Sequence, residues 1–222
     1  MSPISVLIKP ASGMCNMSCE YCFYYDETKK REQESFGFMS EETLKNVIRK
    51  TMLRAEGRIT YAFQGGEPTL RGIEFFRKAV ELQKKYNKND ISVTNALQTN
   101  GLLLDEEWCQ FFKENHFLVG VSIDGTKEIH DKLRHNKTKG GTFEKIEKGI
   151  ELLEHYEVEY NILTVVSHDV ACNIEKIYRF YKEKSWNYQQ YIACLDPLEE
   201  AHWERNGGKM NIHSNRKNMV CF

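Results

Sequence analysis

The sequence predicts an α/β fold built on a parallel sheet, and two patterns lead to this prediction. Six β-like stretches alternate with helix-like stretches along the chain, which is typical of right-handed βαβ units. Polar loops that carry glycine or cysteine follow the first four of these strands, at the carboxyl ends where such folds bind ligands. The pattern alone leaves two architectures open, a partial barrel and a flat, doubly wound sheet.

The first strand and the first helix are separated by a long loop. The strand is expected at 5–9, where Pro10 stops it. The stretch 11–38 has no hydrophobic period, and loops of this length are typically functional. Ser40 is a suitable N-cap for the helix that follows. That helix carries an apolar stripe for the core, made of Leu44, Val47, Ile48 and Met52.

The same reasoning places the other elements. Strands are expected at 58–63, 91–97, 117–123, 159–166 and 188–195. Helices are expected at 72–86 and 142–156, with two more that begin after the N-caps Asp105 and Asn173. The regular spacing of apolar residues ends after Pro197. We therefore expect one α/β domain over 1–199 and an irregular tail over 200–222.

The composition is that of a globular chain. Its 222 residues are 41% hydrophobic and 28% charged, which excludes a disordered or fibrous protein. A net charge of -1 gives no reason to expect nucleic acid or a membrane surface as a partner. No apolar run approaches the roughly 20 residues that span a bilayer. The first ten residues do not read as a secretory signal, so we expect a reducing, cytoplasmic location.

Three of the seven cysteines form a C-x3-C-x2-C motif, at Cys15, Cys19 and Cys22. This spacing favours a 4Fe-4S cluster, in which three cysteines leave one iron open for a ligand. Zinc is the alternative metal, but its structural sites have a second Cys or His pair, and no histidine precedes His116. Three buried cysteines serving as small apolar residues are the other alternative, which the polar surrounding loop disfavours.

Two further loops have residues suited to binding. Gly65-Gly66-Glu67-Pro68 follows an apolar strand, and its glycines suit either close approach of a ligand or a tight turn. Ser122 and Asp124 share one face at a strand end. A hydroxyl and a carboxylate there suit either a ribose or a turn.

The remaining polar candidates have plainer interpretations on pattern alone. Arg134 lies in a charged loop, as solvated surface arginines do. Three histidines have no ligand spacing with one another and are expected to be ordinary polar residues: His130, His135 and His155.

Taken together, the motifs resemble those of anaerobic sulfatase-maturating enzymes, a branch of the radical S-adenosylmethionine (SAM) enzymes. The resemblance extends from about Val6 to about Glu199. It is carried by the blocks 8–12, 15–24, 62–70, 97–101, 119–125, 128–130 and 194–198.

The resemblance implies a partial (β/α)6 TIM-type barrel with two cofactors. Cys15, Cys19 and Cys22 would hold the 4Fe-4S cluster. SAM would contact Tyr21, Gly66, Ser122, Arg134 and Leu195, which changes the interpretation of Arg134 from surface residue to carboxylate clamp. The enzyme would reductively cleave SAM to a 5′-deoxyadenosyl radical and oxidise a Cys or Ser of an unfolded sulfatase polypeptide to Cα-formylglycine. Its electron donor would be a low-potential protein such as flavodoxin or ferredoxin.

The chain also departs from this family. The resemblance implies a second, cysteine-rich domain with two auxiliary clusters and a catalytic Asp before it, and neither is found before the end at Phe222. No catalytic side chain is therefore assigned. We expect a truncated maturase, with full activity in doubt. The alternatives are another radical SAM peptide-modifying enzyme and a non-catalytic cluster-binding remnant.

Overall fold

A single parallel sheet forms the centre of the molecule. The computed structural model describes residues 3–22, 24, 32–33 and 35–193. Six strands lie in the order in which they occur in the sequence, and each pairs in parallel with the next. They are β1 (Ile4–Ile8), β2 (Arg58–Phe63), β3 (Ser92–Thr99), β4 (Phe117–Ser122), β5 (Tyr160–Val166) and β6 (Gln189–Ala193).

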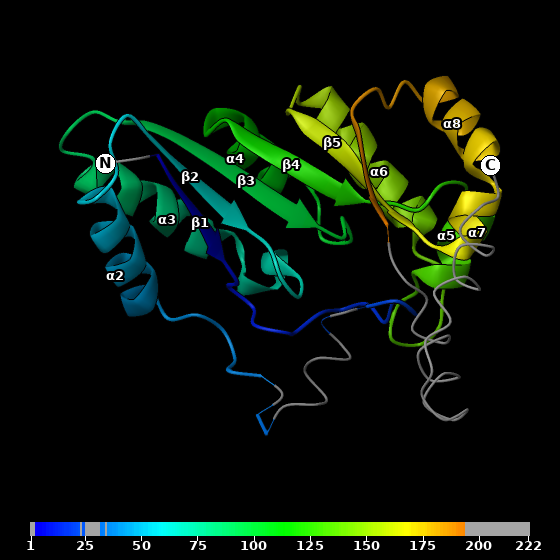
Figure 1. The fold of residues 1–222 in the computed structure, drawn as a ribbon, viewed down its shortest axis with the longest axis horizontal. Helices are drawn as coiled ribbons and strands as arrows, with labels where there is room; N and C mark the ends of the chain where they lie inside the picture. Colours follow the sequence, from blue (N-terminus) through cyan, green and yellow to red (C-terminus); the bar gives the residue numbers. More distant parts are fainter. Residues whose placement is uncertain (1–2, 23, 25–31, 34, 194–222) are drawn as a thin grey trace, which may run out of the picture.

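This strand order decides between the two predicted architectures. A doubly wound sheet reverses its direction of growth part way along, whereas here every new strand is added at the same edge. The sheet therefore curls into a half-barrel (Figure 1). The predicted partial (β/α)6 barrel is confirmed.

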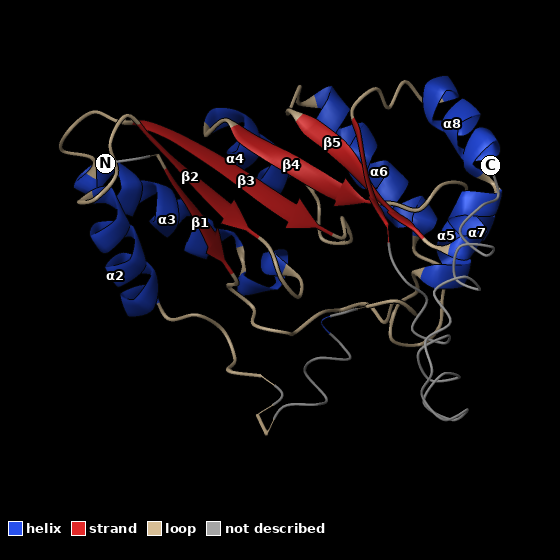
Figure 2. Ribbon diagram, viewed as in Figure 1, coloured by secondary structure: helices blue, strands red, loops and turns tan. Residues whose placement is uncertain are grey.

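Seven α-helices connect the strands within the described residues. They are α2 (Glu41–Met52), α3 (Ile73–Tyr86), α4 (Glu106–Glu114), α5 (Lys127–Leu133), α6 (Phe143–His155), α7 (His168–Cys172) and α8 (Ile174–Glu183). Figure 2 shows α3, α4 and α6 behind the sheet. Among these helices, as far as the structure describes the chain, none is long and apolar enough to cross a membrane.

The core lies between these helices and one face of the sheet. Alternate strand residues such as Phe63, Leu97 and Val119 stand in one register row and are fully or almost fully buried there. Aromatic rings fill the space behind them, with Phe76 edge-on to both Phe63 and Trp108. The opposite face is less covered, because Leu118 is 44% exposed.

The helix ends show where sequence patterns are reliable. Ser40 and Asp105 cap α2 and α4 as predicted, each accepting a hydrogen bond from a backbone N–H three residues later. Asn173 was predicted to cap α8, and the predicted side-chain hydrogen bond is not made. Asn173 stands at the N-cap position but its side chain makes no capping bond and donates to the carbonyl of Asp169 instead. The short helices α5 and α7 were not predicted.

Candidate functional site

Cys15, Cys19 and Cys22 lie on the loop that follows β1, and none of them forms a disulfide. The loop passes beneath the carboxyl ends of the strands and runs toward the segment after α5 (Figure 1). There Met17 forms an antiparallel bridge with Asn136. The cysteine motif is thereby fixed to a part of the chain more than a hundred residues away in sequence.

Gly66 allows the loop after β2 to pack directly on the cysteine loop. Its backbone has a φ of +59°, and an added Cβ would lie 2.4 Å from the carbonyl oxygen of Met14. The next residue, Glu67, donates its N–H to that same oxygen at 2.8 Å. The sequence left both close approach of a ligand and a tight turn open for this glycine pair. The structure shows a close approach of Gly66 to the protein's own backbone.

Glu67 connects the loops after β2 and β3. Its side chain is 1% exposed and accepts hydrogen bonds from the backbone N–H and hydroxyl of Thr69. It also accepts from the Thr99 hydroxyl at 2.8 Å and from the Asn100 backbone N–H at 2.7 Å. Burial raises the pKa of Glu67, and these donors oppose the shift. With its oxygens occupied by the chain itself, Glu67 acts as a brace between loops.

Tyr21, Asp124 and Arg134 form a buried polar group beside the cysteines. The Tyr21 hydroxyl donates to Asp124 Oδ2 and accepts from Arg134 Nη1 at 2.6 Å. The other oxygen of Asp124 accepts the backbone N–H of Val165 at 2.9 Å. Burial raises the pKa of Asp124 while the Arg134 cation opposes this. Three segments, from the cysteine loop, the end of β4 and the end of α5, thus meet at one point.

Arg134 is buried, which contradicts the solvated-surface interpretation from pattern alone. The residue is 6% exposed, and burial would lower its pKa, but Cys19, Tyr21 and Asp124 raise it well above its ordinary value. Its Nε is buried and has no hydrogen-bond partner among the described residues. A buried, charged donor without a partner is costly. This atom is therefore suited to an anionic ligand such as a carboxylate.

His130 hydrogen-bonds to the backbone of Asp124 and is linked through Thr142 to the backbone of Arg134. Its Nδ1 accepts the Asp124 backbone N–H at 3.2 Å, and its Nε2 lies 3.0 Å from the Thr142 hydroxyl. That hydroxyl donates to the Arg134 carbonyl at 2.8 Å. Because Nδ1 accepts, the ring is the neutral Nε2–H tautomer. Burial lowers the pKa of His130 well below its usual value, and Arg134 lowers it further.

Ser122 is the last residue of β4 and lies on the face of the sheet opposite the core residues Val119 and Val121, with its hydroxyl bound by Gln98. The Gln98 amide donates to Ser122 Oγ at 3.0 Å. Gln98 reaches across Gly120, where a Cβ would lie 2.1 Å from its amide oxygen. Because the Ser122 oxygen accepts from Gln98, its own proton is left to donate to a ligand.

The thiols have the chemistry of cluster ligands. Burial raises the pKa of Cys15 to about 11 and also raises that of Cys19, so thiolates here call for a compensating positive centre. Within the described residues, no three His, Cys, Asp or Glu side chains converge as ligands of one metal ion. Cysteine thiolates are the ligands of iron–sulfur clusters, and three of them leave one iron of a 4Fe-4S cube open, so the three cysteines fit such a cluster.

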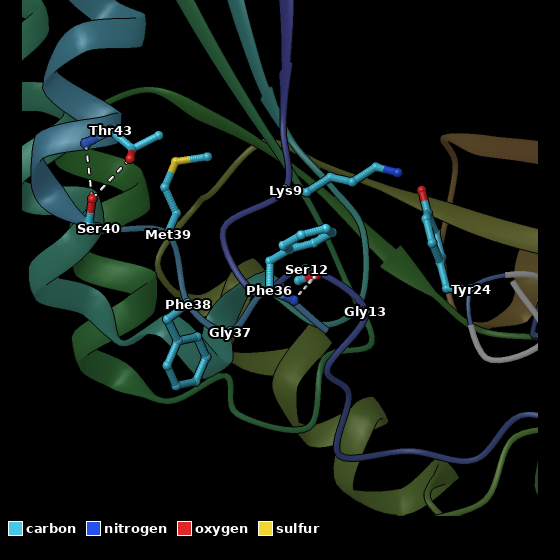
Figure 3. A pocket seen from close by; sticks show the side chains of 10 residues that line it. All are labelled: Lys9, Ser12, Gly13, Tyr24, Phe36, Gly37, Phe38, Met39, Ser40 and Thr43. Atoms are coloured by element: carbon cyan, nitrogen blue, oxygen red, sulfur yellow. Dashed lines mark hydrogen bonds between the residues drawn. The ribbon is translucent and has the colours of Figure 1, made fainter. Parts of the chain in front are cut away.

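Two cavities border the cysteine loop. One, of about 480 Å³, lies between this loop and the start of α2. Figure 3 shows the Lys9 side chain extending toward Tyr24 in it, with Phe36 and Phe38 on the other side. The second, of about 370 Å³, is lined by Cys15 and Asn16, by Leu70, and by residues of the segment 136–138.

The structure brings most of the predicted site residues to one end of the sheet. The cysteines, Tyr21, Gly66 and Arg134 lie there on the loops after β1, β2 and α5, and Ser122 lies there as the last residue of β4. Leu195 lies outside the described residues, as do Cys194 and Cys221. Sequence reasoning missed the roles of Glu67, Asn100 and His130 in joining these loops. The segments 65–68 and 97–101 were noted as polar loops, but pattern does not show which side chains turn inward.

Comparisons with known proteins agree with this geometry. The model of the radical SAM superfamily matches residues 10–181. A cysteine-type anaerobic sulfatase-maturating enzyme of Clostridium novyi is 50% identical over 200 residues, which are 90% of this chain and 54% of the relative. A serine-type enzyme of Bacteroides thetaiotaomicron is 40% identical over 197 residues, which are 88% of this chain and 47% of the relative. The chain spans about half the length of the curated relatives it matches.

Solved structures give the same result. Native anSMEcpe with bound AdoMet superposes with a TM-score of 0.84 at 48% identity, covering 88% of this chain and 53% of that one. The same protein with bound AdoMet and Cp18Cys peptide gives 0.82 at 47% identity, covering 88% and 52%. Spore photoproduct lyase, at 8% identity and a TM-score of 0.62 over 91% of this chain and 61% of its own, shares the fold alone.

Proposed function

We propose, because the chain belongs to the radical SAM superfamily, that its three clustered cysteines bind a 4Fe-4S cluster and that the adjoining loops bind SAM. The observation that carries this is the position of the cysteine loop. It lies against a buried group, Tyr21, Asp124 and Arg134, in which Arg134 Nε has no hydrogen-bond partner among the residues described. A cofactor with a carboxylate would give this donor its partner.

Arg134 Nε, which has no partner among the described residues, and the Ser122 hydroxyl, which accepts from Gln98, support two of the proposed contacts. We assign the SAM carboxylate to Arg134 and the ribose to the free proton of Ser122. The backbone of Gly66 would meet the amino group, and the backbone of Tyr21 the adenine. Leu195 would also touch the adenine, although it lies outside the described residues. When bound, the cluster and SAM together supply a hydrogen-abstracting radical, and the residues around them orient SAM and exclude water.

We propose that the substrate is a Cys or Ser side chain of a sulfatase polypeptide, which is oxidised to Cα-formylglycine. The support is the resemblance to cysteine-type and serine-type maturating enzymes and to a structure with a bound peptide. A low-potential donor such as flavodoxin or ferredoxin would supply electrons, and a reducing cytoplasm would keep the thiols available. Residues 1–199 would form the cofactor-binding domain, and the tail expected over 200–222 lies outside the described residues.

The first experiment measures cofactor cleavage. The chain is expressed without oxygen, reconstituted with iron and sulfide, and incubated with SAM and a strong reductant. We expect 5′-deoxyadenosine from the native chain and none from Cys15→Ala. A native chain that binds its cluster but forms no 5′-deoxyadenosine would favour a non-catalytic, cluster-binding protein.

Two further measurements test the contacts and the substrate. Arg134→Lys keeps the charge but loses the forked donors, so we expect SAM affinity to fall roughly tenfold while iron content is unchanged. Arg77→Lys, at an exposed position, is the control. Formylglycine formed on a peptide with a Cys-x-Pro-x-Arg motif, and not on unrelated peptides, would support the sulfatase assignment; the reverse pattern would favour another peptide-modifying enzyme.

A further inference from the structure

Asn100, at the carboxyl end of β3, contacts the first cysteine of the motif. Its Nδ2 lies 3.6 Å from Cys15 Sγ and 2.7 Å from the side-chain oxygen of Asn16. The backbone N–H of Met17 also donates to Cys15 Sγ, at 3.4 Å. The sulfur of Cys15 therefore receives one donor from its own loop and one from a different strand.

The orientation of the Asn100 amide is fixed by its other end. Asn100 Oδ1 accepts the backbone N–H of Leu102 at 3.0 Å. A backbone N–H can only donate, so the oxygen must face Leu102 and the NH2 group must face Asn16 and Cys15. The two N–H bonds of the amide then have separate acceptors, the Asn16 oxygen and the Cys15 sulfur.

The position of Asn100 is held firmly as well. The residue is 6% exposed, and its backbone N–H donates to Glu67 Oε2 at 2.7 Å. Glu67 is itself held by Thr69 and Thr99. The donor to Cys15 is thus built into the brace between the loops.

We propose that Asn100 raises the reduction potential of the cluster by hydrogen bonding to the sulfur of Cys15. This inference rests on the proposed function, because it needs Cys15 to be a cluster ligand. Reduction adds one electron to the cluster and makes its sulfurs more negative. A hydrogen bond to such a sulfur therefore stabilises the reduced state more than the oxidised one. Asn100 makes delivery of that electron easier without touching SAM.

The test is potentiometry of the reconstituted full chain without SAM. Asn100→Leu keeps the size of the side chain and removes the donor without adding charge. We expect the equilibrium constant for reduction to fall about tenfold, which is about 59 mV for one electron. Asn100→Asp should lower the potential further, since it adds a negative charge. Asn115→Leu, the same substitution at the C-cap of α4, is the matched control and should leave the potential unchanged.

Each outcome has a definite meaning. An unchanged potential in an Asn100→Leu variant with full iron content would overturn the inference, and so would an equal shift in Asn115→Leu. If neither Asn100 variant holds a cluster, the native chain labelled with 15N in its asparagine side chains decides. A 15N coupling to the reduced cluster in pulsed EPR is then expected, and its absence overturns the inference. A native chain that takes up no cluster at all would instead refute the proposed function.

Discussion

At the scale of single residues, Gly66 tolerates substitution by a residue with a side chain poorly. An alanine there would adopt a positive φ, which costs about 1–2 kcal/mol, and would also press on the Met14 carbonyl oxygen at 2.4 Å. That oxygen already accepts the N–H of Glu67 and cannot move away without breaking the contact between two loops. We expect Gly66→Ala to lower the free energy of unfolding by about 3–4 kcal/mol, measured by urea denaturation.

Gly57 provides the matched control for this prediction. Its φ is +72°, but nothing lies within 4 Å of an added Cβ. Gly57→Ala should therefore carry the backbone cost alone, about 1–2 kcal/mol. Equal losses in the two variants would show that the contact with Met14 contributes nothing.

At the scale of elements, His130 links β4, α5 and α6 and should make stability depend on pH. Its folded-state pKa is depressed by burial and by Arg134, so below pH 6.5 the unfolded chain binds a proton that the folded chain does not. Stability is then complete above pH 6.5 and is lost as the pH falls. This residue should account for a loss of about 1.4 kcal/mol between pH 7.5 and pH 5.5.

His130→Gln isolates that contribution, because glutamine can bond to the same partners and does not titrate. Urea denaturation at both pH values should show the loss of stability due to His130 in the native chain and not in the variant. The exposed His155 is the control, and His155→Gln should keep this loss. Parallel pH profiles for the native chain and His130→Gln would contradict the prediction.

Sequence periodicity predicts helices and strands better than it predicts the contacts between them. The bounds of β2 were predicted in full, because apolar alternation and flanking turns are local properties. The short helix α5 was missed because its seven residues hold too few turns for a clear period. Arg134 follows it, and its burial arises from Tyr21, 113 residues away in sequence. Contacts of that kind are formed by the tertiary fold. The family resemblance implied that Arg134 binds SAM, but the contact with Tyr21 was not anticipated.

The same limit applies to the candidate site. The cysteine motif was found from spacing, since its three cysteines lie within one loop. Glu67 and Asn100 were noted only as members of polar segments, because their function depends on a hydrogen bond between two different loops. Asn173 shows the opposite error. The residue type suits a cap, but the preceding helix α7 provides a competing acceptor at Asp169.

At the scale of the whole molecule, the cysteine loop joins the two halves of the sheet. It contacts the loop after β2 through Met14 and Glu67, and the segment after α5 through the bridge between Met17 and Asn136. In addition, Ser18 donates its N–H to the carbonyl of His135 at 2.9 Å. A cluster bound by three cysteines of this loop would therefore hold both contacts in place at once.

Cluster binding should consequently stabilise the entire fold and not only the loop. A group that binds the folded chain and not the unfolded one adds its binding free energy to stability. We expect anaerobic urea denaturation to give the reconstituted chain on the order of 3 kcal/mol more stability than the iron-free chain, as for a ligand at about a hundred times its Kd. Cys15→Ala should abolish the difference. Cys172→Ala, which removes an exposed thiol on α7, should preserve it. Coincident unfolding curves for chains with and without bound iron and sulfide would mean that the loop is attached too weakly to transmit the stabilisation. The sheet would then fold independently of the site that it carries.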